Sequence, residues 1–358
     1  VYMTLGAKLG VVAAESSCTL VTKRAGRWLA VIIGASVFFI SGAFQFGNNL
    51  GVHSAFKVYE PAIHSLTKGW GFTFDFDYVV VVFNALSIAF LFGFKNLYRA
   101  VERLMMAFVG LMLLSFAINL MIARPRVGEL LTGFVPGAEA SIDISVLGLV
   151  GTTFVITAAF FQTYLVRRKG WGIGELKSGL LDARIGAVIM ALITLMIMTT
   201  AGTVLRGKEL ANVADVALQL EPLFGETGRA LFCIGLFSAA YSSFMVNSMI
   251  GGFIFADGLG FDSDNSDRWS RIFTMGVLVT GMSVALYVIK TGWNPVPAIV
   301  AAQAVTVIAS PLVAGALWWL TSREDIMGDM RNSRLTNVMA GLGLVLLIAI
   351  AAYTAAVK

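Results

Sequence analysis

Nine apolar segments dominate this sequence, and each is long enough to cross the roughly 30 Å hydrocarbon core of a bilayer as an α-helix. The 358-residue chain is 58% hydrophobic and only 13% charged, and a water-soluble domain could not bury that much apolar surface. We therefore expect an all-α integral membrane protein rather than a soluble enzyme. The predicted spans are residues 28–52, 78–94, 104–123, 144–166, 185–205, 230–256, 272–289, 296–320 and 335–357.

The connections between these segments are too short for a separate soluble domain, and there is no solenoid-type repeat. We expect one transmembrane domain over residues 1–358. The opening stretch Val1–Ala14 is apolar but short and contains Lys8, so we interpret it as the end of a helix whose beginning lies outside this sequence. Cys18 and Cys233 do not form a disulfide or zinc pattern and are expected to be packing residues.

The basic residues predict an orientation. Of the 26 Lys and Arg residues, 17 lie on one set of alternate connections and nine on the other side. Short cytoplasmic loops carry the excess of positive charge, so the richer set is expected inside and the C-terminus outside. The richer set comprises residues 8–27, 95–103, 167–184, 268–271 and 323–334.

The first span keeps polar side chains in the middle of apolar sequence. Ser41, Gln45 and Asn48 fall on one helical face, and such a stripe must point away from lipid. One interpretation is a solute pathway along this face. The other is that the amides only bond neighbouring helices, which is common in helical bundles.

Polar uncharged groups also gather in three later spans. Gln303, Thr306 and Ser310 share one face of the eighth span, Ser238 and Ser242 share one face of the sixth, and the fourth span carries Thr152 and Thr153. No Asp, Glu, Lys, Arg or His lies in the middle of any predicted span, which argues against a proton pump or a voltage sensor. Ligation by amide, hydroxyl and carbonyl oxygens suits a hard cation such as magnesium, which also retains several of its waters.

The order of these segments resembles the NRAMP family of divalent-metal transporters. The stretch Gly151-Thr-Thr-Phe-Val-Ile-Thr157, followed by Ala-Ala-Phe-Phe-Gln-Thr-Tyr-Leu-Val-Arg, is similar to helix 6 of that family. Gln303, Pro311 and the segment 320–328 resemble helix 10 and the loop after it, and residues 1–10 resemble the end of helix 2.

The resemblance makes the nine spans helices 3 to 11 and leaves helix 1 and most of helix 2 outside this sequence. It implies a LeuT-like inverted-repeat transporter fold, in which helices 1 and 6 are broken at the midplane and expose backbone carbonyls to the ion. Gly148 and Gly151 would permit such a break.

The departures from the family pattern bear on the substrate. Typical members carry Ala-x-x-Met-Pro-His in helix 6, where this chain has Thr152, Val155, Ile156 and Thr157. A methionine thioether favours softer ions such as manganese and iron, so its replacement removes a means of rejecting magnesium. Uncharged residues around Gln45 and Asn48 stand where the family has acidic proton-pathway residues. The chain thus resembles the NRAMP-related magnesium transporter branch.

We therefore expect a carrier of divalent cations that works by alternating access, without proton coupling, with magnesium as substrate and manganese as the second choice. The divalent ion is the transported substrate, and membrane lipid is the other expected partner. No cofactor, nucleic acid or obligate protein partner is expected. A bacterial cell membrane is the expected location. The expected metal ligands are Thr152, Thr153, Gln303 and the carbonyl of Val155, and the expected outer-shell groups, which would meet metal-bound water, are Gln45, Asn48, Thr157 and Thr306.

Two other functions remain open at this stage. A proton-coupled manganese or iron importer of the ordinary NRAMP type would take up protons together with metal. A transporter of an organic solute such as an amino acid would be favoured if helix 1 lacked the acidic family motif. His53 and His64 lie in a predicted outer connection, and we interpret them as surface polarity rather than a metal site.

Overall fold

The computed structural model is helical throughout the part of the chain that it describes. The described residues are 1–13, 15–67, 75–93, 144–204, 221–261 and 267–356, together with some positions between 106 and 128.

The first half of the chain contributes one long helix and several shorter ones. In chain order they are α1 (Tyr2–Val12), α2 (Ser17–Ala25), α3 (Arg27–Lys57), α4 (Glu60–Thr67) and α5 (Tyr78–Gly93). The short α2 begins at an N-cap, because the Ser16 side chain accepts a hydrogen bond from the Thr19 amide, and it ends at Gly26, whose positive φ of 94° suits glycine.

The second half contributes most of the long helices. These are α8 (Ile144–Thr153), α9 (Ile156–Arg168), α10 (Ile173–Val204), α12 (Glu221–Leu259), α13 (Asp267–Thr291), α14 (Pro295–Ser322) and α16 (Arg334–Ala356). A short α15 (Glu324–Met327) and a 3₁₀ turn at Gly328–Met330 join α14 to α16.

The helices agree with the predicted spans. Seven stretches of the described residues are long and apolar enough to cross a membrane, with α8 and α9 counted together. The predicted spans at 78–94 and 104–123 correspond to α5 and to a shorter apolar helix at Val109–Ile118, and part of the latter span lies outside the described residues. Several helices run beyond their predicted limits. For example, α3 reaches Lys57 and α12 reaches Leu259.

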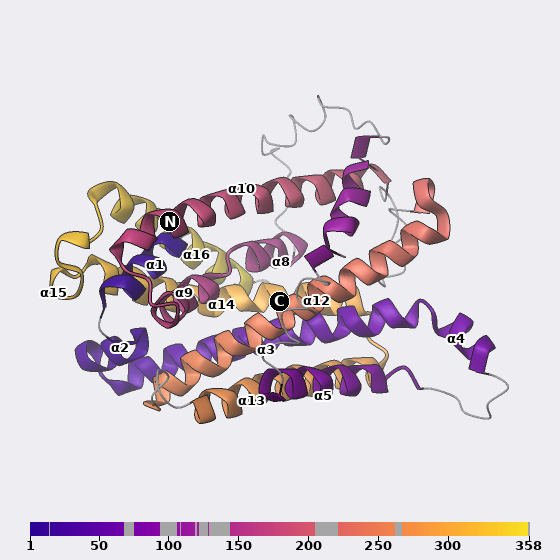
Figure 1. Ribbon diagram of the computed structural model, residues 1–358, viewed down its shortest axis with the longest axis horizontal. Helices are drawn as coiled ribbons and strands as arrows, with labels where there is room; N and C mark the ends of the chain where they lie inside the picture. Colours follow the sequence, from indigo (N-terminus) through magenta and orange to yellow (C-terminus); the bar gives the residue numbers. More distant parts are fainter. Residues whose placement is uncertain are drawn as a thin grey trace.

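The centre of the bundle is the pair α3 and α12, which lie side by side over much of their length (Figure 1). Glycines allow the close approach: a methyl group in place of the Gly258 hydrogen would lie 2.6 Å from the carbonyl oxygen of Ala30. Helices α1 and α9 approach one another in the same way, through Gly6 and Gly10 of α1. Small residues at such crossings are how membrane helices gain van der Waals contact.

The connecting helices mark the two ends of the bundle. Helices α2 and α15 lie at one end, and α4 lies at the other (Figure 1). An ion pair of 2.8 Å between Arg24 and Asp325 ties α2 to α15. This places two of the predicted basic connections, 8–27 and 323–334, at the same end of the bundle.

Candidate functional site

The fourth predicted span is broken near its middle. Helix α8 ends at Thr153 and α9 begins at Ile156, with Phe154 and Val155 between them in non-helical conformation. The φ and ψ of Val155 are −76° and 71°, which is the conformation of an inverse γ-turn. The break expected from the family resemblance is therefore present, although its two central residues are not glycines.

The break changes the backbone hydrogen bonds. The Ile156 amide donates to the carbonyl of Phe154 at 2.8 Å, whereas a continuous helix would direct it to the carbonyl of Thr152. The Thr152 carbonyl thereby loses its helical partner. The carbonyl of Val155 does not, because it accepts from the amides of Ala158 and Ala159 at 3.0 and 3.4 Å.

Thr152 and Thr153 are exposed at the end of α8. Both hydroxyls donate to the carbonyl of Leu149, at 2.9 and 2.8 Å. This is the usual back-bonding of threonine in a helix. Because the hydroxyl proton is used in that bond, the oxygen lone pairs remain available on the exposed side.

Helix α14 lies directly against α8. A methyl group at Gly151 would lie 2.2 Å from the carbonyl oxygen of Gln303 and 2.9 Å from the Thr306 hydroxyl oxygen, so only glycine permits this contact. Gly148 makes a similar approach to Val300. The two glycines therefore serve the packing of α8 on α14, a role distinct from the predicted one at the break.

Gln303 occupies the space between α8 and α3. Its side chain is buried, its Nε2 lies near Gly47 of α3, and its Oε1 is a buried acceptor without a hydrogen-bond partner among the described residues. The hydroxyl of Thr306 donates to the Gln303 carbonyl at 2.6 Å and is thereby held on the same helical face. The structure thus brings Gln303, Thr306 and the end of α8 together.

The polar stripe of α3 faces α12 instead. Gln45 is fully buried and its Nε2 donates to the carbonyl of Phe244, while Asn48 donates to Gln45 Oε1 at 3.2 Å and contacts Ser243 at 3.4 Å. Gln45 therefore joins helices in the way that the alternative interpretation predicted, and Asn48 is only half-buried. Thr157 is buried on α9.

A model of the Nramp family, described as natural resistance-associated macrophage protein-like, matches residues 1–356 of this sequence. The chain belongs to the NRAMP family. This confirms the family resemblance seen in the sequence of helices 6 and 10.

Curated relatives of this NRAMP chain are divalent metal cation transporters named MntH. The protein from Deinococcus radiodurans is 25% identical over 99% of this chain and 78% of its own length. The protein from Verminephrobacter eiseniae is also 25% identical, over 95% of this chain and 75% of its own length. These relatives are transporters rather than enzymes.

Solved structures show the same fold. A crystal structure of a single-residue variant of the Eremococcus coleocola manganese transporter matches 98% of this chain and 76% of its own, with a TM-score of 0.70 and 16% identity. The same transporter in complex with an aromatic bis-isothiourea substituted compound gives a TM-score of 0.71. The expected all-α, LeuT-like transporter fold is confirmed.

The donors at the helix break of this NRAMP chain are neutral. Among the described residues, no group of three or more His, Cys, Asp and Glu side chains is arranged to hold a metal ion. Where typical family members have a thioether and an imidazole, the break here has Val155 and the buried Thr157. Any ion at this position would meet carbonyl, hydroxyl and amide oxygens, often through water.

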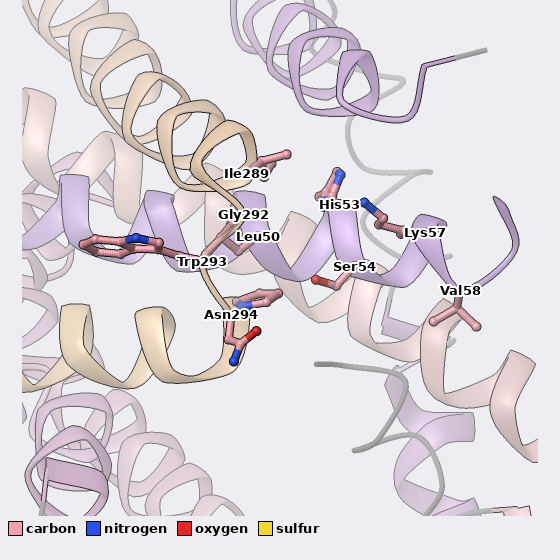
Figure 2. Close-up of a pocket in the computed structure, with 10 residues that line it drawn as sticks. Leu50, His53, Ser54, Lys57, Val58, Ile289, Gly292, Trp293 and Asn294 are labelled. Carbon is pink, nitrogen blue, oxygen red and sulfur yellow. The ribbon is translucent and has the colours of Figure 1, made fainter. Parts of the chain in front are cut away.

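A pocket of about 360 Å³ lies at the C-terminal end of α3 and the N-terminal end of α14. Figure 2 shows Leu50, His53, Ser54 and Lys57 on α3, opposite the connection from α13 to α14 that carries Trp293 and Asn294. Pro295 also lines it, and Gln303 lies eight residues further along α14, about 12 Å at the helical rise. The pocket is therefore nearer to the start of α14 than the contact between Gln303 and Gly47 is.

Two ionisable residues of the long helices are buried, which the sequence analysis did not predict. His53 is 4% exposed and pairs with Asp77 at 3.2 Å, so its interpretation as surface polarity was wrong. Asp257 is 3% exposed, one residue beyond the predicted limit of its span, and is bonded by four donors. Both lie near helix ends rather than at the break. The basic connections indicate where the helices end in the sequence. They do not indicate which residues at those ends are buried in the folded protein.

Proposed function

We propose that this NRAMP protein carries divalent cations by alternating access, with magnesium as its preferred substrate and without proton coupling. The chain spans about three quarters of the length of the relatives that it matches along nearly its whole length, so the activity proposed here is that of the whole protein. Membership of the family supports divalent-cation transport. The finer claims rest on the residues around the helix break.

The observation that carries the proposal is the unpaired amide oxygen of Gln303. A buried acceptor without a partner costs about 1 to 3 kcal/mol, so such an atom calls for a ligand or a bound water. It lies on the helix that packs against the end of α8, where the Thr152 carbonyl has lost its helical partner. Two uncharged oxygens of this kind suit a hard cation that retains part of its hydration shell.

The remaining proposed ligands differ in whether their oxygen atoms already accept hydrogen bonds. The hydroxyl oxygens of Thr152 and Thr153 are exposed and keep their lone pairs, whereas the Val155 carbonyl already accepts two amide hydrogens. Thr306 and Thr157 are proposed as outer-shell groups around the metal site. We assign the outer-shell role on α3 to Asn48, and Gln45 holds Asn48 in place through their 3.2 Å hydrogen bond.

The residues at the break between α8 and α9 support magnesium as the preferred substrate. A softer ion such as manganese gains from a thioether, and none of the residues from Gly151 to Thr157 supplies one. The absence of proton coupling is supported by the same segment, because it carries no side chain that gains or loses a proton near neutral pH. The buried His53 and Asp257 lie toward opposite ends of the bundle, and each is already engaged by polar partners.

A second candidate is a proton-coupled manganese importer. It is favoured by the similar solved structures, which are those of a manganese transporter. The two candidates differ in substrate and in the movement of protons, and both can be measured on one preparation.

We further propose that the chain forms one transporter domain in a bacterial cell membrane, with the basic connections inside and the C-terminus outside. The bacterial relatives support this location. The placement of α2 and α15 at one end of the bundle supports the alternation of connections on which the orientation depends (Figure 1).

The test is cation uptake into liposomes that contain the full-length protein. Magnesium and manganese are supplied separately and then in competition, with protein-free liposomes as the blank. Saturable magnesium uptake that manganese only weakly inhibits supports the proposal. Manganese uptake that a large excess of magnesium does not reduce would overturn the substrate assignment in favour of the second candidate.

A further inference from the structure

Four hydrogen-bond donors from two different helical segments converge on the carboxylate of Asp257. Its Oδ1 accepts from Ser16 Oγ at 2.7 Å and from Thr19 Oγ1 at 3.1 Å. Its Oδ2 accepts from the backbone amide of Cys18 at 3.1 Å and from Tyr164 Oη at 2.5 Å. The carboxylate belongs to α12, three of the donors to the start of α2, and the fourth to α9.

A carboxylate that is 3% exposed near the end of a membrane helix is costly unless it is fully hydrogen-bonded. Here every donor is a neutral group, so hydrogen bonds alone compensate the burial of the carboxyl group. Asp257 also supplements Ser16 in capping α2, because it accepts the amide of Cys18 in the first turn of that helix. Such an arrangement is strong while complete and is lost as a unit when the elements separate.

The elements joined at Asp257 fall into two groups. Helices α2, α3 and α12 pack on one another, and Gly258 of α12 lies against Ala30 of α3. Helix α9 is the second half of the broken span and packs mainly on α1, through Gly6 and Gly10, with a smaller contact to α12 and α2. Two buried hydrogen bonds cross between the groups: Tyr164 Oη donates to Asp257, and Ser17 Oγ of α2 donates to Thr163 Oγ1 of α9 at 2.7 Å. Phe161 of α9 also packs on Phe253 of α12.

We propose that Asp257 is a positioning residue that latches α9 to α2 and α12 at this end of the bundle and so controls how often that end opens during transport. The inference rests on the proposed transport function. Each opening of this end must break the bond between Tyr164 and Asp257. Weakening the bond therefore shifts the population toward states open at the end of the bundle that carries α2.

The latch contains its own reporter. Cys18 lies within it, is fully buried, and directs its thiol at the carbonyl of Ile254 at 3.8 Å. Burial, and secondarily the charge of Asp257, raise the pKa of the Cys18 thiol well above its ordinary value. The thiol is therefore slow to react with a maleimide while the latch is closed, and opening would expose it.

The experiment measures maleimide labelling of Cys18 in the full-length protein in liposomes, without metal, in a Cys233→Ala background. The variants are Tyr164→Phe and Asp257→Asn. Tyr164→Phe removes the bond from α9 to Asp257 and leaves the three bonds from α2 to Asp257, and the bond from Ser17 to Thr163, in place. It also removes the Tyr164 hydroxyl that lowers the pKa of the Cys18 thiol, a change that by itself would slow labelling rather than accelerate it. The matched control is Tyr2→Phe, which removes a buried tyrosine hydrogen bond of 2.8 Å to Ala340 elsewhere in the bundle.

We expect Tyr164→Phe to label about tenfold faster than the parent, the change expected from losing one hydrogen bond to a charged group, and Tyr2→Phe to label at the parental rate. Asp257→Asn should label faster still, because the Nδ2 amino group of asparagine is itself a donor and would face the hydrogen-bond donors that now bind the carboxylate. If Asp257→Asn does not fold, Tyr164→Phe still decides the question. Unchanged labelling in Tyr164→Phe, or equal acceleration in Tyr2→Phe, would overturn the latch.

A transport measurement separates this role from simple stability. In a protein biased toward opening at the α2 end, the metal site is open to the opposite side of the membrane less often. The KM for metal supplied from that opposite side should therefore rise in Tyr164→Phe. An unchanged KM would contradict the latch. Because labelling is recorded without metal, it tests the latch even if magnesium is not the substrate, and the two proposals can fail separately.

Discussion

The amide of Ile156 bonds to the carbonyl of Phe154 at 2.8 Å and so leaves the carbonyl of Thr152 without its helical donor. One local turn thereby provides a backbone oxygen for a ligand without any charged side chain. The unpaired amide oxygen of Gln303 lies on the neighbouring helix. The account of this NRAMP protein as a carrier of hydrated cations depends on these two oxygens.

Replacing Gln303 with leucine should lower magnesium uptake at sub-saturating concentration about tenfold. The substitution keeps the apolar volume but removes the buried amide oxygen, and a lost hydrogen bond or ligand of this kind is worth about 1.4 kcal/mol. Uptake in liposomes is the measurement. Gln162→Leu on α9, whose Cβ packs near Gly6 of α1, is the matched control and should retain parental uptake. Equal losses in both variants would refute a specific role.

Thr152→Val and Thr153→Val should each reduce magnesium uptake severalfold while leaving the thermal stability nearly unchanged. Valine has the shape of threonine without its hydroxyl, and both hydroxyls bond only to Leu149 within their own helix. Thr194→Val is the control, since Thr194 is a half-buried threonine of α10 that bonds to Met190 in the same way. Uptake that is normal in all three variants would remove these hydroxyls from the site.

Installing a thioether at the break should move the selectivity toward softer metals. In Val155→Met, we expect manganese to inhibit magnesium uptake at about tenfold lower concentration than in the parent, because methionine sulfur favours softer ions. The control is Val305→Met on the exposed side of α14. An unchanged ratio of manganese to magnesium uptake would indicate that residue 155 does not face the ion.

Gly151→Ala should destabilise the protein by about 1 to 3 kcal/mol, because the added methyl would meet the Gln303 carbonyl oxygen at 2.2 Å and force α8 away from α14. Thermal unfolding in detergent measures the effect. Gly315→Ala in α14 provides the comparison, because the atom nearest to its added methyl is 3.9 Å away. A Tm as high as that of Gly315→Ala would disprove the close packing described here.

The connection between α14 and α16 should show a pH dependence. Hydrogen bonds from Arg323, together with the charges of Arg24 and Arg323, lower the pKa of the Asp325 carboxyl in the folded protein. Its stabilising contribution is therefore complete above the ordinary aspartate pKa of about 3.9 and is lost as the pH falls through the lowered value. The Tm advantage of the parent over Asp325→Asn should accordingly disappear in acid, and a constant difference across that range would contradict the assignment.

Much of the fold follows from hydropathy, because membrane helices must satisfy their own backbone and are therefore long and apolar. The ends of the helices were predicted less well. Helix α12 continues past residue 256 because Asp257 finds four donors inside the protein, and those donors come from segments distant in sequence. His53 of α3 is similar, since it pairs with Asp77, which lies 24 residues further along the chain, just before α5.

The candidate site was predictable in part. The position of the break came from the family resemblance, and the shared face of Gln303 and Thr306 from helical spacing. Spacing could not tell that the stripe on α3 is turned toward α12, where Gln45 bonds to Phe244. Which oxygens remain unpaired depends on three helices at once and becomes visible only in the folded structure.

The most direct measurement records magnesium entry and internal pH at the same time, in liposomes containing the full-length protein. An inward proton gradient is imposed in one series and omitted in the other. The account predicts magnesium influx without internal acidification and at the same rate in both series. Acidification in step with metal entry, or influx that requires the proton gradient, would contradict it.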